Sequence, residues 1–137
     1  MKITFTVFSI LLFVVSGCST LKPSPDMGLD PETVLVTYHV KPGNEAEFEQ
    51  VLWQTWKIYQ GLHLVTAQPH TVIKTTEDNG KLRYVEIFTW ISHAVPDHAP
   101  QPVIAAWARL TDLCENRDGH NGLEGGEVQN VPPPQSQ

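Results

Sequence analysis

The chain has 137 residues and carries 15 acidic side chains against 9 lysines and arginines, which gives a formal net charge of -6 at pH 7. Nucleic acids and anionic lipid surfaces both require clustered Lys and Arg on the protein that binds them. We therefore expect no nucleic acid among the partners of this acidic chain.

The N-terminus has the pattern of a signal peptide. Met1-Lys2 precedes an uncharged, mostly apolar stretch over residues 3–15, which is shorter than the roughly 20 residues of a membrane-spanning helix. The adjoining Val15-Ser-Gly-Cys18 resembles the lipobox of bacterial lipoproteins, in which a diacylglycerol is attached to the cysteine and the chain is cleaved just before it. The alternative is an ordinary secretory signal with an accidental cysteine.

The lipobox resemblance implies a signal peptide over residues 1–17 and lipidation, including palmitate, at Cys18. Several acyl chains on one residue give stable attachment to a lipid bilayer. Ser19, in place of an aspartate, implies by the same resemblance the outer membrane, facing the periplasm. Lipidation would leave Cys114 as the sole free thiol, so we expect no intrachain disulfide.

Composition separates one domain from its flanks. Residues 18–32 combine the lipidation site with prolines and little apolar content, which predicts a flexible tether. Residues 132–137 form a Pro-rich tail that cannot continue a strand or a helix. A single domain over residues 33–131 remains. With Lys2 removed along with the signal peptide, the mature chain from Cys18 onward carries 8 basic against 15 acidic side chains, a formal net charge of -7.

The domain begins with a predicted strand and helix. Val34–Val40 is rich in β-branched and aromatic residues, which is typical of strands. Asn44 is a candidate N-cap, and Gly61 stands where a left-handed C-terminal residue is expected. Between them, apolar residues at helical spacing predict an amphipathic helix: Phe48, Val51, Leu52, Trp56 and Tyr59.

A hairpin, a connection, a second helix and a last strand follow. Strands over 70–76 and 81–90 flank Asn79-Gly80, the strongest short signal for a β-hairpin. The connection over 93–100 contains two prolines, which favour extended backbone at the residues before them. The second helix has one apolar face, and a weaker last strand is expected over 126–131. That apolar face comprises Val103, Ala106, Trp107, Leu110 and Leu113.

The order β-α-β-β-α-β predicts an α+β, ferredoxin-like domain with both helices on one face of an antiparallel sheet. In the third strand, Val85 and Ile87 alternate with a more aromatic set, so both faces are largely apolar. That set comprises Tyr84, Glu86, Phe88 and Trp90. Because helices cover only one face, we expect the aromatic face to pack against a second copy, giving a homodimer.

Two segments resemble the antibiotic biosynthesis monooxygenase-like proteins of the dimeric α/β-barrel superfamily: Lys41–Phe48, which enters a helix after a strand, and Tyr84–Ser92, which leads into a histidine-bearing turn. The resemblance implies two ferredoxin-like subunits packed sheet to sheet, with a pocket between sheet and helices. Characterised members of that family include cofactor-independent monooxygenases of polycyclic aromatics and haem-degrading enzymes. Trp90, Ser92 and His98 match the family's tryptophan, small residue and following histidine.

No cofactor is expected. Ala105–Ala108 stands on the second helix where the haem-degrading relatives carry their ligating histidine. His93 and His98, with Asp97, do not have the spacing of a zinc site, and we expect no metal. The remaining interpretations are a stiff connection with locally bonded imidazoles, and a role for His98 at the mouth of a pocket.

A candidate catalytic pair involves Glu86, a carboxylate between aromatic residues of its own strand. His39 lies on the neighbouring first strand, and a His39–Glu86 pair would be an acid/base dyad. The alternative is a glutamate that forms an ion pair, or that meets Arg83 or Arg109 of a partner. The candidate catalytic residues are therefore His39, Glu86 and His98, and the candidate pocket-lining residues are Thr37, Tyr84, Phe88 and Trp90.

Two function classes remain open. One is a membrane-anchored lipoprotein that binds a small molecule, such as an aromatic one, without catalysis. The other is a cofactor-independent monooxygenase acting on a small aromatic or quinone-like substrate. The fold cannot decide between them, because it hosts many activities.

Overall fold

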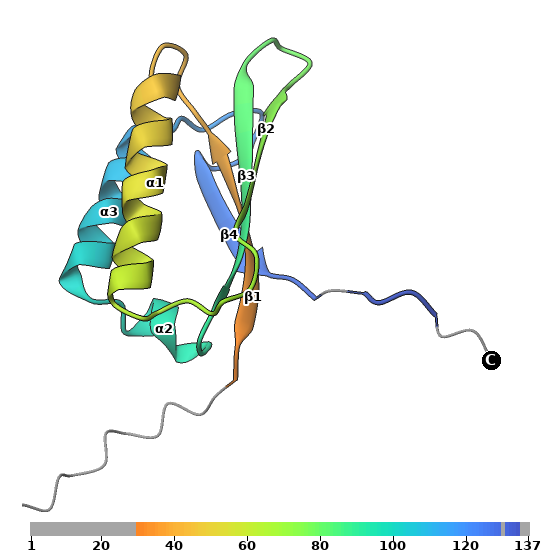
Figure 1. Cartoon of the computed structure of the whole chain (residues 1–137). Helices are drawn as coiled ribbons and strands as arrows, with labels where there is room; N and C mark the ends of the chain where they lie inside the picture. The colour runs from red at the N-terminus through yellow and green to blue at the C-terminus, as the bar shows by residue number, and fades with distance from the viewer. Residues whose placement is uncertain (1–29, 130, 135–137) are drawn as a thin grey trace, which may run out of the picture.

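The computed structural model describes residues 30–129 and 131–134 and arranges them in two layers (Figure 1). One layer is a sheet of β1 (Glu32–His39), β2 (Thr71–Thr76), β3 (Leu82–Trp90) and β4 (Leu123–Glu127). The other contains helices α1 (Glu45–Gly61) and α3 (Gln101–Asp112), packed against each other on one face of the sheet. The short helix α2 (Ala94–Asp97) lies at one end. This is the expected ferredoxin-like order, with one short helix added.

The strand order β2-β3-β1-β4, with all neighbours antiparallel, makes β1 and β3 the central strands. The register pairs Val34 with Phe88 and Tyr38 with Tyr84, so the side chains at these even-numbered positions share one face. That face lies under the helices. Phe48 of α1 contacts both tyrosine rings, at centroid distances of 5.0 Å to Tyr38 and 4.8 Å to Tyr84.

The expectation that the aromatic face of β3 packs against a second copy is wrong. Tyr84, Phe88 and Trp90 are buried within the chain, against side chains of α1, α3 and the neighbouring strand β1. The aromatic rings supply the large apolar area that an amphipathic helix covers, so they belong to the chain's own core. The face left open carries smaller apolar residues instead, including Val85 and Ile87.

The hairpin is confirmed, whereas the end of the first helix differs from expectation. Gly80 has φ 79°, as the turn between β2 and β3 requires. Gly61 is the last residue of α1 and is not left-handed; His63, two residues later, has φ 54°. Asn44 precedes the helix, but its side chain makes no capping bond, and the Glu45 carboxylate instead accepts a bond from the backbone N–H of Gly43.

The connection before α3 is partly helical, which corrects the expectation of extended backbone before both prolines. Pro96 lies in the first turn of α2, where a backbone N–H has no partner within the helix, so proline is tolerated there. Val95 before it is helical and buried. Pro100, by contrast, immediately precedes α3 in extended conformation.

The last strand was expected over 126–131 but begins earlier, at Leu123. It pairs with β1 from Tyr38 to Val34, and the backbone N–H of Val128 still bonds to the carbonyl of Thr33. Two glycines within Leu123–Glu127 weaken the strand pattern in the sequence, since glycine has low strand propensity. Pairing with β1 therefore sets this strand's position, and local sequence does not.

Candidate functional site

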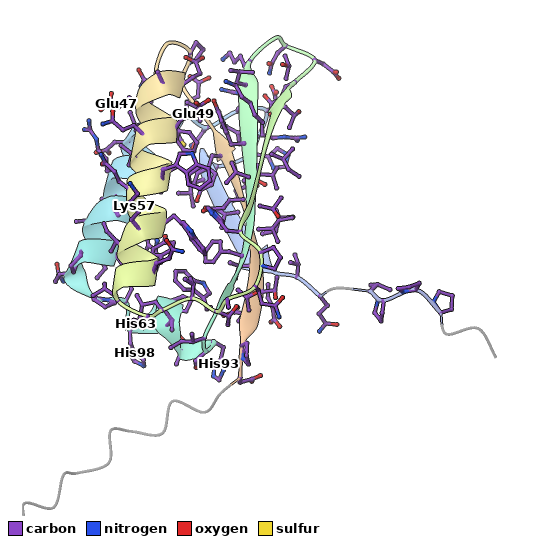
Figure 2. All side chains as sticks on the ribbon, viewed as in Figure 1. Glu47, Glu49, Lys57, His63, His93 and His98 are labelled. Carbon is purple, nitrogen blue, oxygen red and sulfur yellow. The ribbon has the colours of Figure 1, made fainter. Side chains whose placement is uncertain are left out.

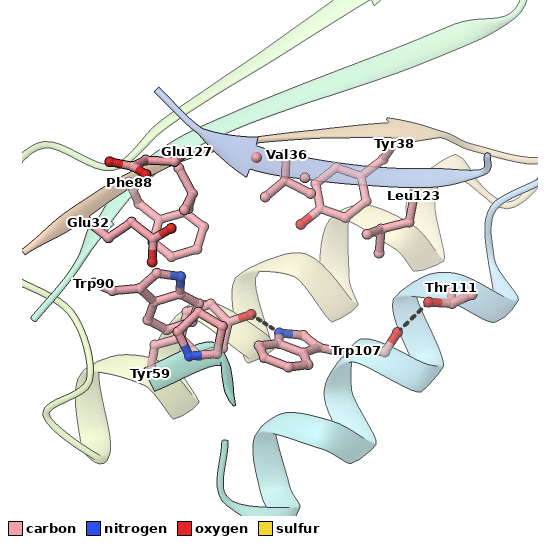
Figure 3. Close-up of a pocket in the computed structure, with 14 residues that line it drawn as sticks. Glu32, Val36, Tyr38, Tyr59, Phe88, Trp90, Trp107, Thr111, Leu123 and Glu127 are labelled. Carbon is pink, nitrogen blue, oxygen red and sulfur yellow. Dashed lines mark hydrogen bonds between the residues drawn. The ribbon is translucent and has the colours of Figure 1, made fainter. Parts of the chain in front are cut away.

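A pocket of about 460 Å³ lies between the helix-covered face of the sheet and α3, and Figure 3 shows it from close by. Its walls come from β1, β3 and β4, from Tyr59 of α1 and from Trp107 and Thr111 of α3. Five aromatic rings dominate the lining: Tyr38, Tyr59, Phe88, Trp90 and Trp107. The other lining residues are Glu32, Val34, Val36, Pro96, Thr111, Leu123, Gly125, Gly126 and Glu127.

The sheet register explains why these residues meet. Val36 and Tyr38 project toward the helices because strand side chains alternate between faces. Across β4, Gly125 pairs with Val36, and a side chain on this glycine would start 3.6 Å from a Val36 methyl group. Because glycine has no side chain, this wall leaves room for the pocket.

Tyr59 and Trp107 join the two helices at the pocket. The Trp107 indole N–H donates a hydrogen bond to the Tyr59 hydroxyl at 2.5 Å (Figure 3). Burial raises the pKa of Tyr59 well above its ordinary value, so the phenol stays neutral. Its own proton is available as a neutral donor.

A buried carboxylate is linked to the pocket through Tyr38. The Tyr38 hydroxyl donates to Glu86 Oε2 at 2.6 Å, and His70 Nε2 lies 2.7 Å from Glu86 Oε1. The His70 ring stacks on Trp56 at a centroid distance of 3.8 Å. Burial, and next the charge of Glu86, raise the pKa of Tyr38 well above its ordinary value. Tyr38 therefore remains a donor to Glu86, and the chain Tyr38–Glu86–His70 forms a hydrogen-bonded path from the pocket wall to the loop before β2.

The expected His39–Glu86 pair is not formed. His39 pairs across β1 and β3 with Arg83, on the face opposite to Glu86. Its Nδ1 instead lies 2.9 Å from Glu77 Oε1. Adjacency of the two strands was expected correctly, but the register places odd and even positions on opposite faces, so the two side chains cannot meet.

The alternative interpretation of Glu86 was an ion pair or a contact with a partner's arginine, whereas the structure shows a buried carboxylate hydrogen-bonded to a tyrosine and a histidine. Glu86 has its partners, Tyr38 and His70, within the chain. Arg109 pairs with Glu47 on the helix side, and Arg83 lies on the open face of the sheet.

Of the four expected pocket residues, Phe88 and Trp90 line the pocket. Tyr84 shares their face, but it packs on Phe48 and donates to Glu49 at 2.6 Å. Thr37 pairs with Val85 and lies on the open face.

His93 and His98 lie beside α2 at the end of the molecule (Figure 2). Both are exposed, and neither lines the aromatic pocket. His93 Nδ1 is 3.5 Å from Asp30 Oδ2. Among residues 30–129 and 131–134, no group of three or more His, Cys, Asp or Glu is arranged to hold a metal ion. No helix in the described part of the chain is long and apolar enough to cross a membrane.

Sequence reasoning missed Tyr38, His70 and the carboxylates Glu32 and Glu127 as parts of the site. Tyr38 could have been placed from strand alternation alone, because it is two residues from Val36 and four from Val34. His70 was expected as the first residue of the strand over 70–76, but it lies in the loop just before β2, and its contact with Glu86 depends on how that loop folds back.

A second polar cluster lies at the far end of the sheet. Arg117 is buried and donates to Glu77, to Glu115 and to the backbone carbonyls of Val40 and Leu82. It thereby ties the segment after α3 to the end of β1 and to the hairpin. The two terminal nitrogens of Arg117 make these bonds within the chain, whereas its buried Nε has no hydrogen-bond partner among the described residues. Bonds to three segments of the chain indicate a structural role.

Comparison of the sequence with family models gives no match, and comparison with curated proteins gives none either. Solved structures do match. A variant of SnoaB, a cofactor-independent oxygenase from Streptomyces nogalater, superimposes with a TM-score of 0.57 and 22% identity, covering 76% of this chain and 96% of that one.

Two further structures agree. An antibiotic biosynthesis monooxygenase gives a TM-score of 0.55 at 15% identity, over 73% of this chain and 98% of the other. A dimeric ferredoxin-like protein of unknown function from Jannaschia sp. CCS1 gives 0.52 at 13% identity, over 73% and 99%. The expected fold class is confirmed: the chain has the ferredoxin-like α+β fold found in antibiotic biosynthesis monooxygenases.

Proposed function

We propose that this chain binds a small aromatic molecule in the pocket between the sheet and α3. The observation that carries the proposal is the pocket itself, about 460 Å³ in volume and walled by five aromatic rings. Small-molecule sites are typically concave, of about 300 to 1,000 Å³, and mostly apolar with a few polar groups. Tyr38 and Tyr59 supply such polar groups here.

The test is calorimetric titration with a panel of small aromatic and quinone-like molecules. Gly125→Leu should block binding, because a side chain at this position projects toward Val36 and into the pocket. Ala105→Leu adds the same side chain at an exposed position of α3 outside the pocket and should bind as the wild type does. Equal binding by both variants, each shown folded by its melting curve, would rule this pocket out.

A second candidate function is cofactor-independent monooxygenation of a small aromatic or quinone-like substrate. It is supported by the hydrogen-bonded chain Tyr38–Glu86–His70 at the pocket wall, together with the fold shared with SnoaB. A buried carboxylate between two titratable groups is a feature of acid/base sites. Oxygen consumption upon addition of a bound ligand, without any cofactor, would favour this candidate. Oxygen uptake unchanged in Glu86→Gln would count against the role of this chain of bonds.

We further propose a homodimer formed through the open face of the sheet. That face carries Leu35, Ile73, Val85 and Ile87 between threonines, and no element of the described residues covers it. An uncovered apolar sheet face favours packing against another sheet. One protein of similar fold is described as dimeric.

The proposed location is the bacterial cell envelope, with the chain anchored through a lipid on Cys18 and facing the periplasm from the outer membrane. Cys18 and the signal peptide lie outside the described residues, and the proposal is supported by the sequence Val15-Ser-Gly-Cys18. Metabolic labelling with a fatty-acid analogue should mark the wild type and not Cys18→Ser. Equal labelling of both would refute the lipid anchor.

A further inference from the structure

The charged side chains that line the aromatic pocket are all acidic. Glu32 and Glu127 both line it, whereas no lysine, arginine or histidine of the described residues does. Val34 pairs with Glu127, and Glu32 pairs with Trp90, so both carboxylates belong to the helix-side face. Figure 3 shows them at the end of the pocket where Phe88 and Trp90 lie, away from Leu123 and Thr111.

The acidic character continues beyond this end. A second hollow of about 490 Å³ shares Glu32, Pro96 and Glu127 with the aromatic pocket and adds Asp30 and Asp97. Its one basic lining residue, His93, has a side chain that is 66% exposed and already faces Asp30. This end of the aromatic pocket is therefore bordered by carboxylates without a fixed positive partner among the lining residues.

The polar atoms deeper in the pocket add acceptors. The Tyr38 proton is donated to Glu86, and the Thr111 hydroxyl proton to the backbone carbonyl of Trp107. Both oxygens consequently face a ligand as acceptors. The remaining donors of the lining, the Tyr59 hydroxyl and the Trp90 indole N–H, are neutral.

Aromatic walls also favour a positive charge. The face of an aromatic ring attracts a cation within about 6 Å of its centre, and aromatic cages recognise ammonium groups by this means. Glu32 and Glu127 stand at the same end of the pocket as Phe88 and Trp90. A carboxylate beside such rings adds direct Coulomb attraction for the same group.

We infer that the pocket selects a cationic aromatic molecule, an aryl ring system carrying an ammonium group, with its rings among the aromatic walls and its charge between Glu32 and Glu127. This inference rests on the proposed binding function and narrows the ligand to a chemical class. An anionic aromatic ligand would meet two carboxylates and no compensating cation, which disfavours it.

Three probes with one ring system test the inference: 1-naphthylmethylammonium, 1-naphthylmethanol and 1-naphthoate. Each is titrated calorimetrically into the purified protein in a nonionic detergent at low ionic strength. The cation should bind at least about tenfold more tightly than the neutral alcohol, a difference of ~1.4 kcal/mol. The anion should bind most weakly. The cation's advantage should shrink as the salt concentration rises from about 20 to about 500 mM, because exposed charges are screened.

Variants assign the preference to the two carboxylates. Glu32→Gln/Glu127→Gln should remove most of the cation's advantage while leaving the affinity for the neutral alcohol unchanged. Asp78→Asn removes a charge from the exposed turn between β2 and β3, far from the pocket, and should behave as the wild type does.

The possible outcomes distinguish failure of the cation preference from failure of the proposed aromatic-binding function. Binding of all three probes with equal affinity would overturn the cation preference and support the proposed function. Tightest binding by the anion would overturn the preference in the same way. A cation advantage that survives in the double variant would overturn the role of Glu32 and Glu127. Absence of binding by every probe would overturn both the inference and the aromatic-binding function.

Discussion

At the scale of single residues, Glu86 is a buried carboxylate that holds two other side chains by hydrogen bonds. It is buried, and each of its oxygens has a partner, Tyr38 on one side and His70 on the other. Leaving a buried polar group without a partner costs about 1 to 3 kcal/mol, whereas replacing both members of a pair by apolar groups can be nearly neutral.

We therefore expect Glu86→Leu to lower the free energy of unfolding by about 2 to 3 kcal/mol, mainly because the Tyr38 hydroxyl loses its acceptor. The double variant Tyr38→Phe/Glu86→Leu should recover part of that loss, because it also removes the hydroxyl that would be left without an acceptor. Urea denaturation of the wild type, both single variants and the double variant measures the coupling. Additive losses would mean that the two side chains act independently.

Glu77 gives a prediction about acid. Burial opposes its ionisation, but hydrogen bonds from Arg117 and Asn79 outweigh that effect and lower the pKa of Glu77 below its ordinary value of 4.5. A carboxyl whose pKa is lower in the folded than in the unfolded chain stabilises the fold above the ordinary pKa. This contribution is lost as the pH falls below about 4.5 toward the lower folded value.

Glu77→Gln should accordingly lower the free energy of unfolding at pH 7 by about 1 to 3 kcal/mol, because buried Arg117 loses a charged partner. It should also make stability less dependent on pH between about 5 and 3. Asp78→Asn, at the adjacent exposed position, should change stability by less than about 0.5 kcal/mol. Melting temperatures measured across this pH range check both expectations. A variant that loses stability in acid as steeply as the wild type would contradict the assignment to Glu77.

At the scale of elements, Pro100 determines how α3 begins. It precedes the helix with φ -63° in extended conformation, a backbone geometry that proline adopts without strain. Pro100→Gly should therefore lower the free energy of unfolding by about 0.5 to 1 kcal/mol through a freer unfolded chain. Pro132→Gly, at an exposed position outside any helix or strand, should have no measurable effect. Thermal melts of both variants make the comparison, and equal shifts would contradict this account.

Elements with strong local signals could be predicted from the sequence, and those that depend on partners could not. β3 and α1 were placed to within a residue or so because their apolar periodicity is long and regular. β4 was misplaced, since Gly125 and Gly126 conceal a strand that exists through its pairing with β1. α2 was missed because four residues around a proline give no helical period.

The same distinction between local signals and partner-dependent features applies to the candidate site. Phe88 and Trp90 could be found as members of one strand face. The pairing of Glu86 with His39 failed because the sequence shows which strands can be neighbours but not the register between them. His70, Glu32 and Glu127 reach the site only through tertiary folding.

At the scale of the whole molecule, the open face of the sheet predicts the oligomeric state. Light scattering on a chain beginning at Pro31 should give twice the monomer mass. Ile87→Glu places a charge in the centre of the open face and should yield a folded monomer, because a buried unpaired charge is strongly disfavoured. Ile104→Glu, on the exposed side of α3, should leave the dimer intact. A wild-type monomer at micromolar concentration would rule out the proposed dimer, in which the open faces of two sheets pack together.

Cys114 has a practical consequence for such experiments. Its thiol is buried in the core cluster with Val40 and Leu113, and burial raises its pKa to about 11. Thiol reagents attack the thiolate, which is scarce at neutral pH under these conditions. A chain beginning at Pro31 therefore starts with no reactive thiol, and a cysteine placed at exposed position 104 could be labelled selectively without first replacing the native one.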